Sequence, residues 1–421
     1  MPDLAAFRAS LDGDVFTPGS PGYEAIRRPI NVAYWDVRPR LVVRCCSVDD
    51  VAATVAYAHA AGDRVALRSG GHCFAGRSST DGIVLDLSGL DRISVDDHIA
   101  TIGAGARLKQ VYAALHARGR TLPAGCGPTV GIAGLTLGGG IGLLGRKYGL
   151  TCDRLVGAQL VLASGTIVDC DADREPDLFW ALRGAGGGQF GVVTELRFAT
   201  VPEPVAVRIE AHVGEAGVQD LVKAWQDWAP DAPDELTVNL TIDTEPLRAT
   251  LFGASILDEA ATRELLSELT ELPVEVRAGL PYHQLKQTFE GIEQPGRRIR
   301  SEFFSRTMSG DTLAALLAET TGPRQLAFTA MGGAYNRVAE DATAFAHRNE
   351  RFLLEHVGAA PWVERSWAIA HADGSGRVYP NFPDLALDDA PAAYHAGNLR
   401  RLAEIKAAYD PHRFFDFPQA I

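Results

Sequence analysis

Residues 68–77 read Arg68-Ser-Gly-Gly-His-Cys-Phe-Ala-Gly-Arg77, and they place a single histidine, His72, after two glycines where the predicted strand 65–68 ends. Such a loop can turn bare backbone N–H groups towards a phosphate and hold one imidazole beside the molecule that carries the phosphate. An ordinary turn with a solvated histidine is the plain alternative for a motif this short. The remainder of the chain decides between the two.

A second concentration of glycine lies between Gly125 and Gly149. Residues without a Cβ weaken regular elements, so an ordered segment of this kind needs another reason, and close approach to a large ligand is the best one. A flexible linker would be polar and rich in serine, whereas apolar residues interleave these glycines. They are Ile132, Leu135, Leu137, Ile141, Leu143 and Leu144. The segment predicts the wall of a buried cofactor site.

One stretch inside this segment, Gly140-Ile-Gly-Leu-Leu-Gly145, matches the dinucleotide-binding fingerprint letter for letter. The fingerprint carries meaning only between a β-strand and a helix, and residues 134–139 make a poor strand. A better strand precedes Gly103-Ala-Gly105, but a third glycine and a correctly spaced acid are missing there. An NAD(P)-dependent reductase that uses residues 140–145 therefore remains the alternative.

The composition bounds the partners of this chain. Its 421 residues suffice for two or three domains with sizeable cores. Its formal net charge of −13 argues against broad contact with nucleic acid, whose phosphates it would repel. We expect a small-molecule substrate and no nucleic-acid partner, and the sequence leaves the oligomeric state open.

The opening residues and the cysteines bear on the compartment. Residues 1–8 resemble the start of a short amphipathic helix rather than a charged and apolar leader, and no apolar run reaches the ~18 residues of a membrane span. The six cysteines follow no CxxC spacing, and the adjacent Cys45-Cys46 pair suits reduced, buried thiols. We predict a cytoplasmic protein without membrane contact.

The pattern of elements predicts an α+β fold with three consecutive parts. From residue 41 to about 200, short β-branched runs alternate with helical ones, and the prolines of Val201-Pro-Glu-Pro-Val205 mark a boundary. Beyond it, strands and helices predict a substrate domain with an antiparallel sheet. A helix over 394–409 then leads to the end of the chain. The predicted parts are 1–204, 205–375 and a C-terminal segment, 376–421.

Four separated motifs resemble those of one family, the FAD-linked oxidases that share the fold of p-cresol methylhydroxylase and vanillyl-alcohol oxidase, in their berberine-bridge-enzyme-like branch. The motifs are Arg68–His72, Gly131–Leu150, Leu178–Val193 and the C-terminal Tyr379-Pro-Asn-Phe382 with its following helix. The resemblance spans nearly the whole chain. It implies a two-part FAD-binding domain of the p-cresol methylhydroxylase type and a substrate domain whose antiparallel sheet is flanked by helices.

The resemblance implies that His72 carries FAD through a covalent bond to the 8α-methyl carbon of the flavin, which needs a neutral imidazole nitrogen. It also implies which residues surround FAD. In the phosphate loop these are Arg68, Ser69, Gly70, Gly71, Cys73 and Ser78; in the glycine-rich segment Gly125, Cys126, Thr129, Val130, Gly131, Gly134, Leu135, Gly138, Gly139 and Gly142; and near the adenine Gly191, Val192 and Val193.

The chain departs from the family pattern at two positions near the flavin. Relatives with a second flavin bond have cysteine directly before the Pro-Thr-Val that appears here as residues 128–130, whereas this chain has Gly127 there and Cys126 one residue earlier. A shift of one residue usually turns a side chain to another face. We therefore expect one covalent bond, through His72, with Cys126 as the weaker alternative for a second. Leu135 stands where plant members have histidine.

Val130 holds the position that controls oxygen access in plant relatives, and a valine there favours an oxidase over a dehydrogenase. For proton removal from the substrate, the resemblance implies Tyr379 and Asn381 as catalytic residues. Phe382 replaces a second tyrosine of many relatives, and Tyr379 would need a lowered pKa to act as a base. The remaining candidates for the base lie in the second domain. They are His347, His371, Glu302 and Tyr335.

These observations favour an FAD-dependent oxidase that acts on a small alcohol, amine or natural-product intermediate and passes electrons to O2, giving hydrogen peroxide. The alternatives are the NAD(P)-dependent reductase and a binding protein that retains flavin without turnover. The substrate itself is not predictable, because the second domain selects it while the flavin domain stays similar across the family.

Overall fold

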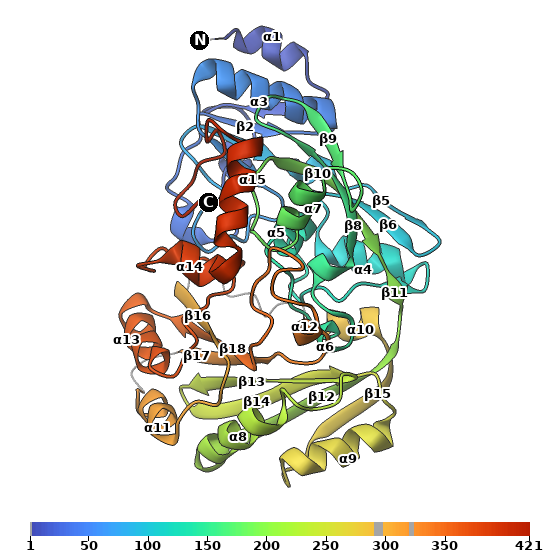
Figure 1. Cartoon of the computed structure of the whole chain (residues 1–421), viewed down its shortest axis with the longest axis vertical. Coiled ribbons are helices and arrows are strands. Elements are labelled where there is room, and N and C mark those ends of the chain that lie inside the picture. The colour runs from blue at the N-terminus through green and yellow to red at the C-terminus, as the bar shows by residue number, and fades with distance from the viewer. Residues whose placement is uncertain (1, 290–297, 320–323) are drawn as a thin grey trace.

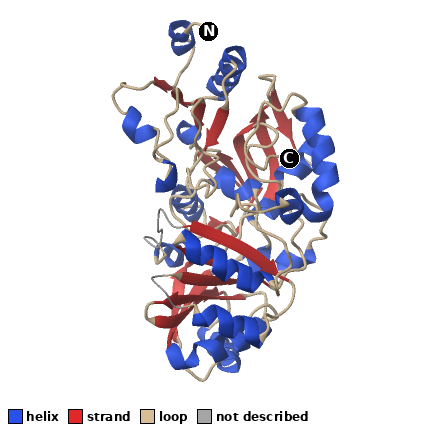
Figure 2. Cartoon of the chain, turned by 90° about the vertical axis from the view of Figure 1, so that its left-hand side faces the viewer, coloured by secondary structure: helices blue, strands red, loops and turns tan. Residues whose placement is uncertain are grey.

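The computed structural model describes residues 2–289, 298–319 and 324–421. The fold has two halves stacked along its long axis (Figure 1). A four-stranded and a five-stranded sheet make up the upper half of Figure 1, and a seven-stranded sheet forms the lower half. Both termini lie in the upper half (Figure 2), so the chain crosses to the lower half and returns. Among the described helices, none has the length and apolar content to cross a membrane.

The four-stranded sheet carries the His72 loop. Its order is β1 (Asp14–Phe16), β2 (Leu41–Arg44), β4 (Ile83–Asp86) and β3 (Val65–Arg68), with β2, β4 and β3 parallel. The parallel strands are short apolar runs, as expected where both faces of a sheet are covered. Helices α1 (Leu4–Ala9), α2 (Tyr23–Ile26) and α3 (Val48–Ala61) accompany them. After β2, Cys45 is buried but Cys46 is exposed, so the pair is not buried as a whole.

The five-stranded sheet is antiparallel. Its order is β5 (Ile93–Asp96), β6 (Ile99–Gly103), β10 (Val192–Ala199), β8 (Leu155–Val161) and β9 (Ile167–Cys170). Between its strands run α4 (Leu108–His116), α5 (Ile132–Leu137), α6 (Gly145–Tyr148) and α7 (Pro176–Leu182). A short pair, β7 (Arg120–Thr121) with β11 (Val201–Pro202), lies where the chain leaves this half. The glycine-rich segment thus forms α5, α6 and the turns around them.

The seven-stranded sheet is antiparallel throughout. Its order is β15 (Glu275–Pro281), β12 (Val205–Gly214), β14 (Leu247–Ser255), β13 (Leu236–Thr244), β17 (Gln325–Ala330), β18 (Phe352–Gly358) and β16 (Arg298–Phe304). Helices α8 (Glu215–Trp228), α9 (Glu259–Leu269), α11 (Gly310–Ala318) and α13 (Ala360–His371) pack on it, and α10 (Tyr282–Gln287) and α12 (Ala334–Arg337) lie towards the upper half (Figure 1).

Alternation along β13 separates the two faces of this sheet. Val238 and Leu240 belong to the apolar core that the helices cover, together with Trp225 of α8. The residues that alternate with them, Thr237 and Asn239, face the other side. Successive strand residues point to opposite faces, so one face of the sheet is apolar and the face turned to the upper half is polar.

The C-terminal segment returns to the upper half as two helices, α14 (Ala390–His395) and α15 (Leu399–Tyr409), and α15 packs on α7. The predicted continuous helix over 394–409 is therefore wrong. The break falls at Ala396, whose φ is +45°, in a conformation that α-helices do not contain. Both the fold class and the antiparallel sheet expected in the second part of the chain are confirmed.

Candidate functional site

A cavity of about 580 Å³ lies between the two halves. Its walls come from the His72 loop, the segment 125–143, the turn 187–193, the seven-stranded sheet and the C-terminal segment 379–383. A cleft of this size, bounded by two domains, is the usual setting for a cofactor or small-molecule site. Segments that are far apart in the sequence therefore build one site.

The His72 loop is fixed from behind by Arg68. The buried guanidinium of Arg68 donates hydrogen bonds to the backbone carbonyls of Ser78 (3.0 Å), Ile26 (2.6 Å) and Arg27 (2.9 Å). Arg68 does not line the cavity, which corrects its expected place beside FAD. It supports the loop instead, because one side chain donates hydrogen bonds to three backbone carbonyls, and buried carbonyls need such partners.

The glycines of the loop allow backbone to pack on backbone. A Cβ on Gly70 would lie 2.3 Å from the backbone nitrogen of Gly131, and one on Gly131 would lie 2.1 Å from Ser69 Oγ. Gly71 has a φ of +76°, which favours glycine. The phosphate loop and the start of α5 are therefore held in direct contact, and both line the cavity.

The imidazole of His72 reaches the cavity wall from this loop. His72 Nε2 lies 2.8 Å from the hydroxyl of Thr129, and this contact fixes the orientation of the ring. Thr129 itself does not line the cavity, so its place is behind the histidine rather than against a cofactor. A fixed imidazole at a cavity wall is the arrangement that covalent attachment of a cofactor requires.

The donors at this end of the cavity fit a phosphate-bearing cofactor. The hydroxyl of Ser78 and Nε of Arg77 are both buried, line the cavity and lack a hydrogen-bond partner within the described residues. Buried donors of this kind call for acceptor oxygens such as those of a pyrophosphate. On the opposite wall, a Cβ on Gly134 would meet no protein atom within 4 Å and would point into space that a ligand can fill.

The structure brings most of the expected cofactor residues to this cavity. The residues that line it are Ser69, Gly70, Gly71, His72, Cys73, Ser78, Gly125, Cys126, Val130, Gly131, Gly134, Leu135, Gly142, Gly191 and Val193. Besides Arg68 and Thr129, three others do not. Val192 is fully buried in the core because it alternates with Val193 along β10, and Gly138 and Gly139 pack against protein instead. A Cβ on Gly138 would lie 2.3 Å from Asn381 Oδ1, and one on Gly139 2.9 Å from the ring of Phe345.

The dinucleotide fingerprint at residues 140–145 does not have the required structural context. It connects α5 to α6, and no β-strand precedes it. A Cβ on Gly145 would lie 1.7 Å from Tyr335 Oη, so this glycine makes room for a tyrosine rather than for a pyrophosphate. The NAD(P) alternative loses its structural basis.

Tyr379 and Asn381 both line the cavity. The hydroxyl oxygen of Tyr379 accepts hydrogen bonds from the backbone N–H groups of Gly140 (2.9 Å) and Ile141 (3.2 Å) and from Asn381 Nδ2 (3.0 Å). Asn381 Nδ2 also donates to the carbonyl of Leu135 at 2.8 Å. Burial raises the pKa of Tyr379 to about 12, although these hydrogen bonds oppose the shift. Tyr379 is therefore a neutral phenol near pH 7, able to donate its hydrogen into the cavity.

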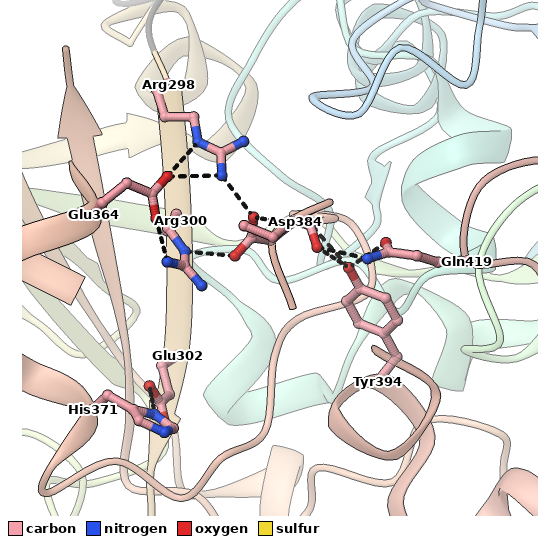
Figure 3. A network of polar contacts seen from close by, with 9 residues as sticks. Arg298, Arg300, Glu302, Glu364, His371, Asp384, Tyr394 and Gln419 are labelled. Carbon is pink, nitrogen blue, oxygen red and sulfur yellow. Dashed lines mark hydrogen bonds and ion pairs between the residues drawn. The ribbon is translucent and has the colours of Figure 1, made fainter. Parts of the chain in front are cut away.

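Asp384 clamps the segment that carries Tyr379 and Asn381 (Figure 3). Its buried carboxylate accepts hydrogen bonds from Arg300 Nε at 2.6 Å and Arg298 Nη2 at 2.9 Å, and both arginines lie on β16. A second set of bonds ties its backbone to the C-terminal region: Asp384 N–H donates to Tyr394 Oη at 2.8 Å and Gln419 Nε2 donates to the Asp384 carbonyl at 2.8 Å. The clamp joins the seven-stranded sheet to the segment at the cavity.

The polar face of the seven-stranded sheet forms the far wall of the cavity. Its lining residues include Thr237, Asn239, Thr241, Gln325, Thr329 and Glu355. Glu355 carries the only carboxyl group among the lining residues, and this carboxyl group has no hydrogen bond or ion pair with any described residue. Burial alone raises its pKa to about 8. A carboxyl group that titrates near neutral pH can accept a proton from a bound molecule.

Glu355 is absent from the sequence-based candidates. A sequence signal for this face of the sheet does exist, although it lies on β13 and not on the strand of Glu355. In Thr237-Val-Asn-Leu-Thr241 polar residues alternate with apolar ones, which indicates that one face of the sheet is polar. Of the candidates that were named in this half, Tyr335 lines the cavity, and its hydroxyl donates to the carbonyl of Gly142 at 2.7 Å. His347 is fully buried away from the cavity, and His371 pairs with Glu302 at 2.8 Å, apart from it (Figure 3). These three do not reach the site.

Comparison with known proteins places the chain among flavoproteins. Residues 39–171 match the family described as "FAD binding domain", and residues 378–421 match "Berberine and berberine like". An uncharacterized FAD-linked oxidoreductase of Bacillus subtilis (strain 168), YgaK, is 32% identical over 98% of each chain. Glucooligosaccharide oxidase of Sarocladium strictum is 30% identical over 98% of this chain and 93% of that protein.

Solved structures agree with the sequence comparison. BBE-like 1 of Physcomitrella patens superposes with a TM-score of 0.92 at 27% identity, over 100% of this chain and 99% of that one. Glucooligosaccharide oxidase of Acremonium strictum superposes with a TM-score of 0.90 at 26% identity, over 99% and 98% of the two chains. The resemblance predicted from the sequence is confirmed. This chain belongs to the berberine-bridge-enzyme-like family of FAD-linked oxidoreductases.

Proposed function

We propose that this chain is an oxidase: it takes a hydride and a proton from a small alcohol, amine or natural-product intermediate, and O2 takes up the electrons as hydrogen peroxide. The observation that carries the proposal is the cavity that joins the FAD-binding half to a polar sheet wall bearing one carboxyl group, Glu355. FAD supplies the hydride acceptor. Two relatives that are named as oxidases support the proposal. They are glucooligosaccharide oxidase and a chitooligosaccharide oxidase of Gibberella zeae, which is 28% identical over 91% of this chain and 87% of that protein.

In this proposal Glu355 and Tyr379 divide the work on the substrate. The Glu355 carboxylate accepts the proton of the substrate hydroxyl or amine, because its pKa of about 8 is close to working pH. Tyr379 donates a hydrogen bond to a group bound in the cavity, since its oxygen already accepts from two backbone N–H groups and from Asn381. Asn381 positions Tyr379.

The proposal includes one covalent flavin bond, through His72. The solved glucooligosaccharide oxidase is described as carrying both a 6-S-cysteinyl and an 8α-N1-histidyl FAD. In this chain His72 lines the cavity with its ring fixed by Thr129, whereas Gly127 stands directly before Pro128 and the sulfur of Cys126 contacts Lys286. These contacts support the histidyl bond and disfavour a cysteinyl one.

O2 is the proposed electron acceptor. Val130 lines the cavity at the position that governs oxygen access in plant relatives, and it is smaller than the leucine that would obstruct that path. The cytoplasmic location expected from the sequence stays a prediction.

The first experiment tests the flavin bond. FAD should remain with the protein after acid precipitation and denaturing electrophoresis, and peptide mapping should find flavin on the His72 peptide alone. His72→Ala should release its flavin under the same treatment. His98→Ala is the matched control, because His98 is exposed and pairs with Asp97 on the surface. A wild-type precipitate that is white, with free FAD in the supernatant, would refute the covalent bond.

The same preparation tests the activity. A screen of alcohols, amines and sugars should find a substrate that bleaches the flavin anaerobically and releases hydrogen peroxide in air. Bleaching without peroxide would make the protein a dehydrogenase, and a flavin that no compound of any class reduces would favour the binding protein. Each result is read from the flavin absorbance and from a peroxide assay on the same sample.

A further inference from the structure

A cysteine and a lysine from different halves of the molecule touch beside the cavity. Lys286, on α10, places its Nζ 3.1 Å from the sulfur of Cys126, which lines the cavity in the segment before Pro128. The same Nζ lies 3.3 Å from the carbonyl oxygen of Ala124. Neither side chain takes part in the oxidation proposed above.

The environment of Lys286 favours a reactive amine. The side chain is 4% exposed, and within the described residues it has no carboxylate partner. The rings of Tyr112 and Tyr282 lie 5.0 and 5.6 Å from the nitrogen and replace water around it. Burial lowers the pKa of Lys286, so more of the amine is neutral and nucleophilic than at an exposed site. Cys126 is only half-buried and can meet oxidants that enter the cavity.

We propose that Cys126 and Lys286 are a modification site at which an oxidant forms a covalent N–O–S bridge. One hydrogen peroxide oxidises the thiol to a sulfenic acid and leaves as water. A second peroxide supplies the remaining two-electron oxidation as the amine is joined through the sulfenic oxygen. The amine and the thiol together lose two hydrogens and gain one oxygen, and the two peroxides become three waters. Both reactants already lie in contact, so the bridge needs only a small closure of the gap between nitrogen and sulfur.

The bridge would fasten the glycine-rich segment to the substrate half. Cys126 follows the turn that holds Tyr112 through the carbonyls of Ala124 and Gly125, and α10 belongs to the half that begins with β12. The inference goes beyond the proposed function, because added peroxide can drive the reaction whether or not the protein makes peroxide itself. It also gives Cys126 a role that excludes a bond to flavin.

The test uses the purified flavin-containing protein, treated with hydrogen peroxide, then alkylated and digested without reductant. We expect one cross-linked species whose mass equals the Cys126 and Lys286 peptides plus one oxygen minus two hydrogens, and dithiothreitol should separate it. The species should be lost in Cys126→Ala and in Lys286→Arg, which keeps a cation of similar length. Cys46→Ala is the matched control, since Cys46 is exposed and should leave the bridge intact.

Two outcomes would overturn the proposal. Flavin found on the Cys126 peptide would show that the sulfur serves the cofactor, and oxidation of Cys126 to sulfinic acid without any link to Lys286 would show that the contact does not direct the chemistry. The wild-type mass map decides alone if a variant fails to fold. Flavin content of each variant, measured before oxidation, separates loss of the bridge from loss of the cavity.

Discussion

Tyr379 and Glu355, which both line the cavity, differ in whether they can donate or accept a proton near neutral pH. Tyr379 faces three donors and, within the described residues, no acceptor, so its pKa of about 12 keeps it a hydrogen-bond donor at neutral pH. Among the residues that the structure describes, Glu355 faces no charged partner, and its pKa of about 8 allows it to change charge in the working range. The family motif pointed to the tyrosine as the base, whereas burial and hydrogen bonding favour the glutamate for that step.

The pH dependence of flavin reduction should reveal Glu355. Its burial raises the pKa, so the carboxylate that accepts the proton is scarce well below pH 8 and abundant above it. The anaerobic reduction rate of the wild type should therefore rise with pH through about 8. Glu355→Gln should lose this rise and react roughly 10²–10⁴-fold more slowly, the usual contribution of acid–base help. Stopped-flow absorbance of the flavin measures both.

Tyr379→Phe is the comparison for this experiment. It should slow reduction while keeping the rise with pH, because the hydroxyl does not titrate below about 12. Flavin content and reoxidation by O2 should stay near wild type in both variants. If Tyr379→Phe removes the rise and Glu355→Gln keeps it, the tyrosine is the base.

At the scale of elements, the clamp at Asp384 sets where Tyr379 and Asn381 lie. The carboxylate is 1% exposed and holds two arginines of β16, of which Arg300 is also buried. Asp384→Asn leaves these guanidinium groups with Glu364, which is 42% exposed and a weaker partner. Removing one partner from a buried pair costs about 3–5 kcal/mol, so we expect a loss of that order in the free energy of unfolding.

Denaturant unfolding measures the loss, and Glu364→Gln is its matched control. An exposed ion pair contributes about 1 kcal/mol or less, so the control should stay close to wild type. Asp384→Asn should also slow flavin reduction, because the segment 379–383 forms part of the cavity wall. Equal stability of the two variants would show that the clamp does not hold this segment.

Several helices and strands could be predicted from local sequence, and the predictions that were wrong have physical causes. The strand predicted over residues 65–68 is β3, and β12 begins at Val205, where the predicted boundary ends. The helix over 394–409 fails because its helical spacing continues across Ala396, whereas the positive φ of that residue ends the helix and is not indicated by the spacing. The fingerprint at 140–145 fails because spacing alone says nothing about the strand that must precede it.

The sequence predicted those parts of the candidate site that lie in a family motif. The loop that ends in His72 and the segment Tyr379–Asn381 reach the cavity as expected. Glu355 and Lys286 were missed because each acquires its chemistry from burial in tertiary structure: Glu355 lies opposite Ala327 across β17 and β18, and Lys286 lies among tyrosines of two elements. An isolated charged residue in a sequence is ordinarily on the surface.

At the scale of the whole molecule, buried arginines join the two halves around the cavity. Arg146 of α6 is fully buried and donates to the carbonyls of Leu236 at 3.0 Å and Pro230 at 2.8 Å, both in the lower half. In the opposite direction, Arg348 reaches Asp153 with two hydrogen bonds, of 2.7 and 2.9 Å. Residues of both halves line the cavity, so cofactor binding there and the union of the halves should depend on each other.

Breaking the Arg348–Asp153 pair tests this dependence. Arg348 is 1% and Asp153 10% exposed, so Arg348→Met leaves a nearly buried carboxylate without its cation and should cost about 3–5 kcal/mol of unfolding free energy. Circular dichroism and flavin fluorescence should give one shared unfolding transition in the wild type. In the variant the flavin signal should change at lower denaturant, because the halves separate before they unfold.

Arg351→Met is the control: Arg351 pairs with Asp231, which is 69% exposed, and its loss should cost about 1 kcal/mol or less. Coincident transitions in Arg348→Met would mean that the two halves unfold together without this pair.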